Sequence, residues 1–290
     1  MQIDGHTKLC GLIGNPVGHT LSPLIHNTLA ELTGISLVYG SFLVDPGCLQ
    51  EAVPGAYALH IHGMNVTVPY KSDVIPLLLD IDELASQIGA VNTLVRTDRG
   101  FKGYNTDMPG LYRAMCSDGM EIEGHEVIIL GAGGAARAVA FLCASKGASG
   151  VYVLNRTLSK AQAIVQEIGE KTGYNRMTAM ELSAYHTLPG KDYLVIQSTS
   201  VGLAPHDQEA VIEDEAFYQK VAKGYDLVYR PADTRFMQLV RSHGGQAYNG
   251  LKMLLYQGII AFELWNQVDI TDEQAQIVYE KLKEACYGGD

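Results

Sequence analysis

Residues 1–105 alternate between short apolar runs and longer stretches that carry one apolar face. Alternation of this kind predicts strands and helices in layers, which is typical of a parallel-type α/β domain. Strands are expected at Leu9–Ile13, Leu37–Leu43, Ile61–Val66 and Val91–Arg96, and helices at Pro23–Thr33, Cys48–Ala56 and Lys71–Leu79. The turn residues Asp98, Arg99 and Gly100 then predict a hairpin after Thr97.

A second alternating pattern follows a helix expected at Met108–Ser117. Its strands are expected at Val127–Leu130, Val151–Leu154, Tyr193–Gln197 and Gly224–Tyr229, with a helix over Ala135–Leu142. Two helical stretches end the chain. The stretch Leu251–Trp265 is strongly apolar, whereas Asp272–Cys286 has one polar face and follows a helix start signal. We expect these last helices to pack back toward the first domain.

The apolar run Val127–Leu130 leads directly into a glycine-rich turn, Gly131-x-Gly133-x-x-Ala136. The first glycine permits a tight turn, the second lets backbone approach a phosphate, and the small alanine lets the next helix pack closely. The N–H groups and positive dipole end of that helix favour a pyrophosphate. A tight turn of purely structural origin is the alternative. The strands and helix around the turn favour a dinucleotide site.

The strand after this turn ends in Asn155-Arg156-Thr157. A site that prefers NAD usually has an acidic residue here, which accepts hydrogen bonds from the ribose 2′-hydroxyl. This segment has none. Arg156 can instead pair with a 2′-phosphate, Thr157 can donate to it, and Lys160 is near enough to help. A solvated basic residue is the alternative interpretation, but the missing acid favours NADP.

These patterns together predict an α/β fold with two domains. Residues 1–107 would form an N-terminal substrate-binding and catalytic domain. Residues 108–248 would form a Rossmann-like NADP-binding domain, and residues 249–290 would be the C-terminal helices that return to the first domain. The length of 290 residues agrees with about two domains.

Composition and charge narrow the functional classes. The chain is 47% hydrophobic and 18% charged, so it can bury substantial cores, and its net charge of −11 argues against a nucleic-acid or anionic-membrane surface. Five cysteines without a CxxC pair are typical of reduced thiols in a cytoplasmic protein: Cys10, Cys48, Cys116, Cys143 and Cys286. The start has no signal-peptide pattern, and no apolar run reaches the roughly 18 residues of a membrane span.

Lys71 follows Pro69 at an expected helix start. The helix dipole and partial burial would lower the pKa of its ammonium there, which suits a general acid or base near neutral pH. Taken alone, an ordinary exposed lysine is the more common case, and Asp107 would be a helix N-cap. Thr67, Asn92 and Asn105 alone would be turn residues. The pair His60-x-His62 is more often two hydrogen-bonded histidines than a metal site, so we expect no metal.

Several segments, taken together, favour functional roles over purely structural ones for these residues. In chain order they are Gly14 to Pro23 with His26-Asn27, Asn65 to Lys71, Gly89 to Thr93, Gly103 to Asp107, Gly131 to Ala136, Asn155 to Thr157, and Asn249 to Gln257. This set resembles the motifs of the shikimate dehydrogenase family, over nearly the whole chain and in the right order.

The resemblance implies an NADP-dependent, reversible reduction of 3-dehydroshikimate to shikimate, in aromatic amino-acid biosynthesis, with Lys71 and Asp107 as the acid/base pair. It implies that Thr20 and Ser22 bind the substrate carboxylate with help from Tyr229, and that the ring hydroxyls are bound by Thr67, Asn92, Asp107 and Gln257. It implies the following cofactor-binding residues: Gly131, Ala132, Gly133, Gly134, Ala135, Asn155, Arg156, Thr157 and Lys160, with Leu227 and Gly250 on the nicotinamide side. The partner would be a small molecule bound by a monomer or homodimer.

Three positions depart from the family pattern. Thr20 replaces the usual serine, Asn249 replaces an aspartate, and Gln197 replaces an asparagine. Relatives that act on quinate vary near Thr20, so a quinate/shikimate dehydrogenase with relaxed substrate or cofactor choice is an alternative. A non-catalytic NADP- or shikimate-sensing paralogue is a second alternative. A sensor need not keep an acid/base pair, so the presence of both Lys71 and Asp107 argues against it.

Overall fold

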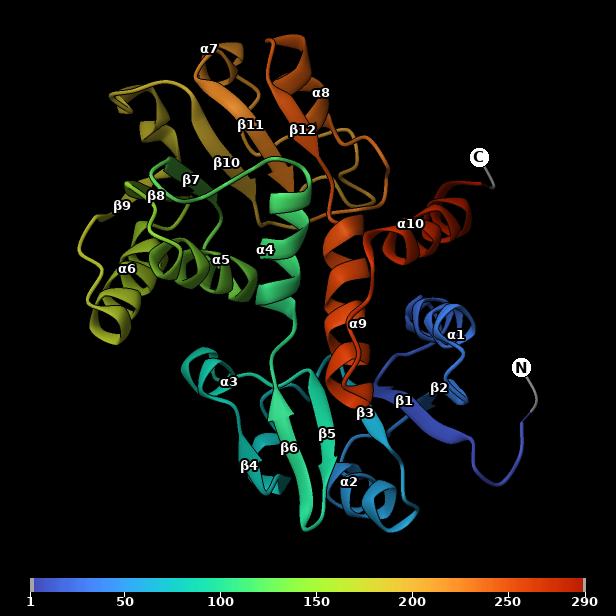
Figure 1. Cartoon of the computed structure of the whole chain (residues 1–290). Coiled ribbons are helices and arrows are strands. Elements are labelled where there is room, and N and C mark those ends of the chain that lie inside the picture. Colours follow the sequence, from blue (N-terminus) through green and yellow to red (C-terminus); the bar gives the residue numbers. More distant parts are fainter. Residues whose placement is uncertain (1–2, 289–290) are drawn as a thin grey trace. The chain divides into compact units, whose positions relative to one another are not determined.

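The computed structural model describes residues 3–288, which form two compact units, each built on one six-stranded sheet (Figure 1). Unit 1 contains the described residues up to Gly110 and those from Leu254 onward. Unit 2 is Leu111–Met253. The expected two-domain α/β fold is thus confirmed.

The sheet of unit 1 is mixed. Its strands are β1 (Lys8–Gly14), β2 (Leu37–Leu43), β3 (Gly63–Val66), β4 (Asp80–Ile81), β5 (Thr93–Thr97) and β6 (Gly100–Tyr104), in the order β2-β1-β3-β5-β6-β4. Strand β1 pairs in parallel with β2 and β3, whereas β5 is antiparallel to both β3 and β6. The hairpin expected after Thr97 is therefore confirmed, and among these strands only β5 departs from the expected parallel-type sheet, because β6 pairs in parallel with β4. The tight turn between Thr97 and Gly100 can join only antiparallel neighbours.

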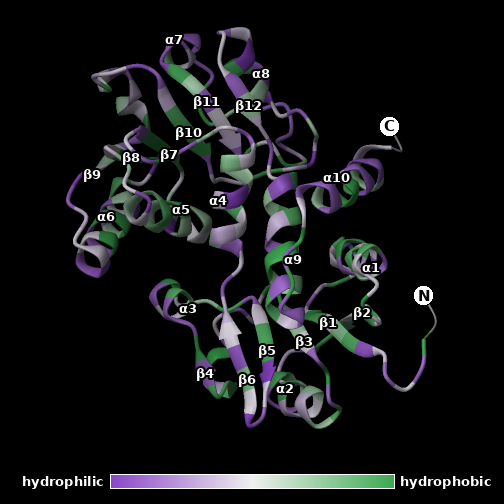
Figure 2. Cartoon of the chain, viewed as in Figure 1, coloured by the Kyte–Doolittle hydropathy of each residue, from purple (hydrophilic) through white to green (hydrophobic). Residues whose placement is uncertain are grey.

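Helices α1 (Ser22–Thr33), α2 (Leu49–Ala58) and α3 (Glu83–Ile88) belong to unit 1. Most of α9 (Leu251–Asn266) and all described residues of α10 (Asp272–Tyr287) join them, as expected for a tail that returns to the first domain. The Trp265 indole donates to the Leu94 carbonyl at 2.9 Å, and Lys8 Nζ donates to Asn266 Oδ1 at 2.9 Å. Helix α10 packs on α1, and Figure 2 shows it with both hydrophobic and hydrophilic positions.

The helix expected over Lys71–Leu79 does not form. Residues 68–74 are turns, and only the short 3₁₀ helix η1 (Ile75–Leu77) follows. Pro76 explains the difference, because it lacks an N–H and disfavours helical backbone at the residue before it. Lys71 therefore does not sit at a helix N-terminus, and the dipole argument for its pKa has no basis.

The sheet of unit 2 is entirely parallel. Its strands are β7 (Glu126–Leu130), β8 (Gly150–Asn155), β9 (Met177–Glu181), β10 (Tyr193–Gln197), β11 (Val221–Asp226) and β12 (Gln246–Tyr248). Their order, β12-β11-β10-β7-β8-β9, is the doubly wound order of a dinucleotide-binding fold. All six strands present their carboxyl ends at the same edge, where ligands of such sheets bind.

Helices of unit 2 connect these strands. They are α5 (Gly134–Ser145), α6 (Leu158–Thr172), α7 (Glu215–Tyr218) and α8 (Arg235–Ser242), with the 3₁₀ helix η2 (Leu182–Thr187), while α4 (Asp107–Ser117) enters the unit from residue 111. The strand expected at Gly224–Tyr229 is wrong at its end. Strand β11 stops at Asp226, whose side chain accepts the Val228 N–H at 3.0 Å and so turns the chain out of the sheet.

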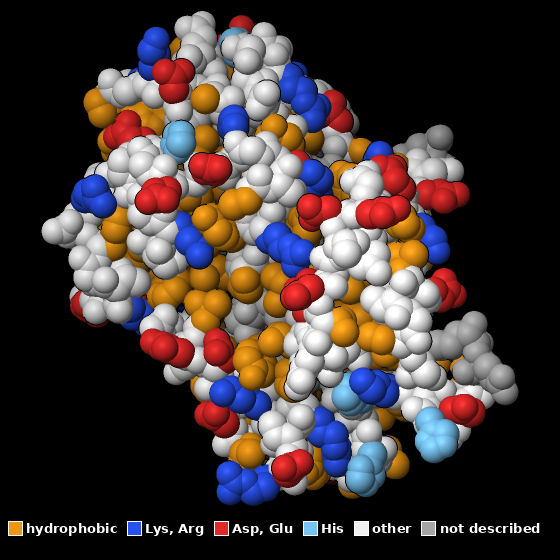
Figure 3. Space-filling view, viewed as in Figure 1, with side chains coloured by type: hydrophobic (Ala, Val, Ile, Leu, Met, Phe, Trp, Pro, Cys, Tyr) orange, Lys and Arg blue, Asp and Glu red, His pale blue; other side chains and the backbone are white. Residues whose placement is uncertain are grey.

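Acidic and basic side chains are interspersed on the face drawn in Figure 3. Within residues 3–288, every helix is too short or too polar to cross a membrane.

Candidate active site

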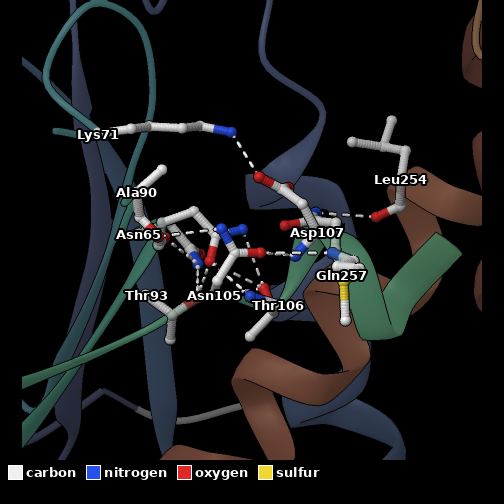
Figure 4. Close-up of polar contacts among 11 residues, drawn as sticks. Asn65, Lys71, Ala90, Thr93, Asn105, Thr106, Asp107, Leu254 and Gln257 are labelled. Carbon is white, nitrogen blue, oxygen red and sulfur yellow. Dashed lines mark hydrogen bonds and ion pairs between the residues drawn. The ribbon is translucent and has the colours of Figure 1, made fainter. Parts of the chain in front are cut away.

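The side chains of Lys71 and Asp107 form an ion pair in unit 1. Lys71 Nζ donates to Asp107 Oδ2 at 2.6 Å, and Figure 4 shows the ammonium pointing at the carboxylate. The two side chains remain 32% and 26% exposed, so a ligand can reach both. The Val91 N–H donates to the Lys71 carbonyl at 2.8 Å and fixes the lysine backbone. The structure thus brings the two predicted catalytic residues together.

Asn105 holds the backbone that carries Asp107. Its Oδ1 accepts from the N–H groups of Asp107 at 3.1 Å and Met108 at 3.3 Å, and its Nδ2 donates to the Ala90 carbonyl at 3.0 Å. The amide therefore satisfies two N–H groups at the start of α4. Asp107 is left with its carboxylate free to accept from Lys71.

A buried network of hydroxyls and amides lies beside the pair. Asn92 Oδ1 accepts from the Thr106 N–H at 2.8 Å and from Thr93 Oγ1 at 3.1 Å, and Asn92 Nδ2 donates to Thr106 Oγ1 at 3.0 Å. Asn92 is 3% exposed. In this structure its amide mainly ties β5 to the segment before α4, and any contact with a substrate hydroxyl would use its remaining hydrogen-bonding capacity.

Tyr39 and Asn65 extend this network through the sheet. The Tyr39 hydroxyl donates to Asn65 Oδ1 at 2.7 Å, and Asn65 Nδ2 donates to Thr93 Oγ1 at 3.1 Å. Burial raises the pKa of the Tyr39 hydroxyl well above its usual value, nearby Cys10 adds to this, and the Ser22 hydroxyl opposes it. Tyr39 therefore stays a neutral donor between the start of α1 and strand β3.

Thr20 and Ser22, the predicted carboxylate-binding pair, lie against each other at the start of α1. Thr20 Oγ1 donates to Ser22 Oγ at 3.1 Å, and the Ser22 N–H donates to Thr20 Oγ1 at 3.2 Å. Thr67 follows β3, where its N–H donates to the Ile13 carbonyl at 2.9 Å. Thr20 and Thr67 therefore lie in the loops that follow β1 and β3, and Ser22 is the first residue of α1.

Gln257 lies on α9 against the first turn of α4. A Cβ on Gly110 would lie 2.7 Å from the backbone nitrogen of Gln257, so only glycine allows this approach. Gln257 Nε2 donates to the Leu254 carbonyl at 2.8 Å, and Figure 4 shows the amide near Asp107. The predicted ring-hydroxyl ligand thus lies near the Lys71–Asp107 ion pair.

The glycine-rich turn of unit 2 has the geometry that a pyrophosphate requires. Gly131 has φ +113°, and a Cβ there would collide with Ser198 and Thr199. Helix α5 begins at Gly134, and no atom lies within 4 Å of a Cβ added to Gly133 or Gly134. The exposed helix start offers N–H groups to an anion, and the backbone there is open. The predicted residues Gly131 to Ala135 therefore fit a dinucleotide phosphate.

The predicted 2′-phosphate residues follow β8. Asn155 Nδ2 donates to the Thr157 carbonyl at 2.9 Å and closes the turn. Arg156, Thr157 and Lys160 are all exposed, with Lys160 on the first turn of α6. The turn directs cationic and hydroxyl groups outward from the carboxyl edge of the sheet, where a 2′-phosphate can reach them.

Leu227, Tyr229 and Gly250 lie in two neighbouring segments of unit 2. The Gly250 N–H donates to the Val228 carbonyl at 3.1 Å, and a Cβ on Gly250 would collide with the Leu227 carbonyl. The structure thus brings the two predicted nicotinamide-side residues into contact. Tyr229 is half-buried in the same loop.

Buried Asp226 anchors this loop. It accepts from Thr234 Oγ1 at 2.6 Å and from Gln197 Nε2 at 3.3 Å. Burial raises the pKa of the Asp226 carboxyl to about 6, against the opposing hydrogen bond from Thr234. Gln197, which departs from the family pattern, also donates to the Val201 carbonyl at 2.7 Å. The glutamine therefore joins the ends of β10 and β11.

The two histidines of the His60-x-His62 pattern precede β3 and are not part of it. His62 Nε2 contacts the Trp265 carbonyl at 2.8 Å, and His60 Nδ1 lies 3.4 Å from an Arg96 nitrogen. Each ring therefore has a polar neighbour within unit 1.

Comparison with known proteins identifies the family. The sequence profile described as "Shikimate dehydrogenase substrate binding domain" matches residues 12–94, and the one described as "Shikimate / quinate 5-dehydrogenase" matches residues 115–218. The chain is 39% identical over 288 residues to the shikimate dehydrogenase (NADP(+)) of Caldanaerobacter subterraneus subsp. tengcongensis, covering 98% of this chain and 99% of that protein. The chain belongs to the shikimate dehydrogenase family.

Solved structures of shikimate dehydrogenases share this fold. One in complex with NADP+ is 35% identical, covers 97% of both chains and has a TM-score of 0.86. The enzyme from Listeria monocytogenes, in complex with shikimate and NAD, is 31% identical, covers 97% of this chain and 98% of that chain, and has a TM-score of 0.88. These similarities cover both units.

The sequence alone did not indicate a role for several residues of the chain. Asn65 and Thr106 lie inside two of the segments that resemble the family motifs, so the sequence could have indicated a role for them. Tyr39 and Asp226 gave none, because their partners Asn65 and Gln197 are distant in sequence. Glu181 was missed because its strand, β9, was not expected.

Proposed function

We propose that this chain catalyses the reversible, NADP-dependent reduction of 3-dehydroshikimate to shikimate. The observation that carries the proposal is the half-exposed ion pair of Lys71 and Asp107. Oxidation of a secondary alcohol removes a proton from its oxygen and a hydride from its carbon. A lysine and a carboxylate in direct contact can manage that proton.

Lys71 acts as the proton donor in the direction of reduction. Its ammonium gives a proton to the carbonyl oxygen, which becomes the hydroxyl of shikimate, and the neutral amine takes that proton back during oxidation. Asp107 keeps the ammonium oriented and accepts a hydrogen bond from the same region of the substrate. The bound dinucleotide supplies the hydride in reduction and accepts it in oxidation.

Unit 1 binds the ring. Thr20 and Ser22 have adjacent hydroxyls that suit a carboxylate. Thr67, Asn92 and Gln257 supply neutral donors and acceptors for the ring hydroxyls. A polyhydroxylated substrate requires a set of this kind, because each buried hydroxyl must find a hydrogen-bond partner.

Unit 2 binds the dinucleotide. The glycine-rich turn and the start of α5 take the pyrophosphate, and the turn after β8 takes the 2′-phosphate. Leu227 and Gly250 take the nicotinamide side. We assign the protein to the cytoplasm, since all five cysteines are free in the structure. We further propose that it acts as a monomer or homodimer.

Initial rates test the proposal. The purified chain is assayed with shikimate and with quinate, each with NADP+ and with NAD+. We expect shikimate with NADP+ to give the highest kcat/KM. Comparable rates with quinate would favour a quinate/shikimate dehydrogenase, and the absence of turnover with every pair, with ligand binding intact, would favour a sensing paralogue.

A further inference from the structure

An acidic residue lies beside the predicted 2′-phosphate turn, on the neighbouring strand. Strands β8 and β9 pair in parallel, and Asn155 is opposite Glu181 in the register. Each is the last residue of its strand. Because adjacent strands lie about 4.8 Å apart, Glu181 reaches the same edge of the sheet as the turn that follows Asn155. The acid that is missing at the end of β8 is thus present one strand away.

Glu181 and Arg156 also line one cavity. This cavity has a volume of about 380 Å³, and its lining includes Arg156, Glu181, Tyr185, Glu213 and Asp214. Arg156 is the only cation among these lining residues, whereas three are carboxylates. The cation that we assign to the 2′-phosphate therefore borders an acidic surface.

The three carboxylates differ in how they are held. Asp214 accepts from the Tyr185 hydroxyl at 2.7 Å and from the Ala216 N–H at 2.9 Å. Glu213 accepts from the Ala210 N–H at 2.7 Å and pairs with Arg235 at 3.3 Å. Local donors therefore compensate both charges.

Glu181 has no such compensation. Within residues 3–288, its carboxylate takes part in no hydrogen bond or ion pair, and it does not cap η2, which begins after it. Glu181 is also exposed. Its charge is therefore available to act on whatever binds beside Arg156.

We propose that Glu181 is a specificity-determining residue that weakens the preference of this chain for NADP over NAD. The inference rests on the proposed cofactor site at Asn155 to Thr157. A carboxylate close to a 2′-phosphate repels it, whereas a carboxylate close to a free ribose can accept hydrogen bonds from its hydroxyls. Glu181 would therefore oppose Arg156 in the choice of cofactor.

Direct binding measurements on the full chain test the proposal, with NADP+ and NAD+ as the titrated ligands in calorimetry. Glu181→Gln removes the charge and keeps the size of the side chain. We expect the Kd for NADP+ to fall about two- to fivefold, because one partly screened charge is removed near a dianion. The Kd for NAD+ should stay the same or rise.

Two controls fix the interpretation. Glu121→Gln removes an exposed acid that precedes β7, toward the opposite edge of the parallel sheet, and should leave both Kd values unchanged. The gain from Glu181→Gln should also shrink as salt rises from about 0.02 M to about 0.5 M, because salt screens exposed charges.

The outcomes separate this inference from the proposed site. If Arg156→Ala weakens NADP+ binding while Glu181→Gln strengthens it, both are supported. If Arg156→Ala weakens NADP+ binding but Glu181→Gln leaves it unchanged or weakens it, the role of Glu181 is wrong and the site stands. If Arg156→Ala leaves the Kd for NADP+ unchanged, the assignment of the site and the inference fall together.

Discussion

Gly110 gives the backbone of Gln257 room to lie against the first turn of α4, since a Cβ at residue 110 would come within 2.7 Å of the Gln257 nitrogen. The atoms in conflict are backbone atoms of α9, so no side chain can rotate away to relieve it. This contact determines how close Gln257 lies to Asp107, one turn earlier on α4.

Gly110→Ala should therefore destabilise unit 1. We expect the free energy of unfolding to fall by about 1–3 kcal/mol, which is typical of overpacking, and the KM for shikimate to rise. Urea unfolding followed by the fluorescence of Trp265 measures the first effect, because Trp265 is the only tryptophan and is buried in unit 1.

Gly55→Ala is the matched control for this prediction. Gly55 lies inside α2, and nothing is within 4 Å of an added Cβ. Alanine is favoured over glycine in a helix by roughly 0.5–1 kcal/mol, so this variant should be unchanged or more stable. Equal destabilisation by both substitutions would show that the close approach at Gly110 is not the cause.

His26 predicts a specific pH dependence of stability. Its ring is fully buried, and it stacks on the Tyr39 ring with the centroids 4.2 Å apart. The Trp265 ring lies 4.9 Å away at a tilt of 43°, and neither nitrogen of His26 has a hydrogen-bond partner among the described residues. Burial lowers the pKa of His26 from 6.5 to about 3, against a smaller opposing effect of Asn65. The folded state thus holds this ring neutral, whereas the unfolded chain protonates it.

The sign follows from the lowered pKa. Stability from the neutral ring is fully present above about pH 6.5 and is lost as the pH falls toward 3, because the unfolded state then binds more protons. Between about pH 7.5 and pH 5 this loss is ~2 kcal/mol. His26→Leu should remove it, so the difference in urea midpoint between the two pH values should be smaller than in the parent chain. An unchanged difference would contradict the buried neutral histidine.

The fold was predictable where its signals were local. Strands β2 and β10 span the residues expected from their apolar runs, and Gly131 makes the expected tight turn before α5, with a positive φ. The prediction of a helix over Lys71–Leu79 was wrong. It rested on the apolar pattern of this segment, but Pro76 lacks the N–H that an α-helix requires there. Strand β9 was missed because its side chains are mostly exposed or half-buried and give no apolar run.

The site was predictable as residues but not as a network. Motifs located Lys71 and Asp107, and the structure brought them into contact. The chain of hydrogen bonds from Tyr39 through Asn65 to Thr93 joins residues on three strands, and only the tertiary fold brings such partners together. The same limit applies to Glu181, which reaches Asn155 through strand pairing.

Thr20 predicts substrate choice. Its Oγ1 is engaged with Ser22, so its methyl group must lie on another side of the side chain. Quinate carries an extra hydroxyl on the carbon that bears the carboxylate, and this methyl should crowd it. Crowding of this size is worth about 1–3 kcal/mol, so kcat/KM should favour shikimate over quinate by roughly 10–200-fold.

Thr20→Ser tests this cause. The serine keeps the hydroxyl and removes the methyl, so activity on shikimate should persist while the gap between the two substrates narrows. Equal kcat/KM values for quinate and shikimate in the parent chain would contradict the crowding argument and favour the quinate/shikimate class.

The most direct test of the account is the steady-state kinetics of Lys71→Ala with shikimate and NADP+. If Lys71 transfers the proton, kcat should fall by about 10²–10⁴-fold while the KM for shikimate changes little, because the lost interaction belongs to the transition state. Asp107→Ala should impair both constants, since Asp107 also holds the substrate. Near-normal turnover of Lys71→Ala would contradict the central claim that the Lys71–Asp107 pair performs the proton transfer.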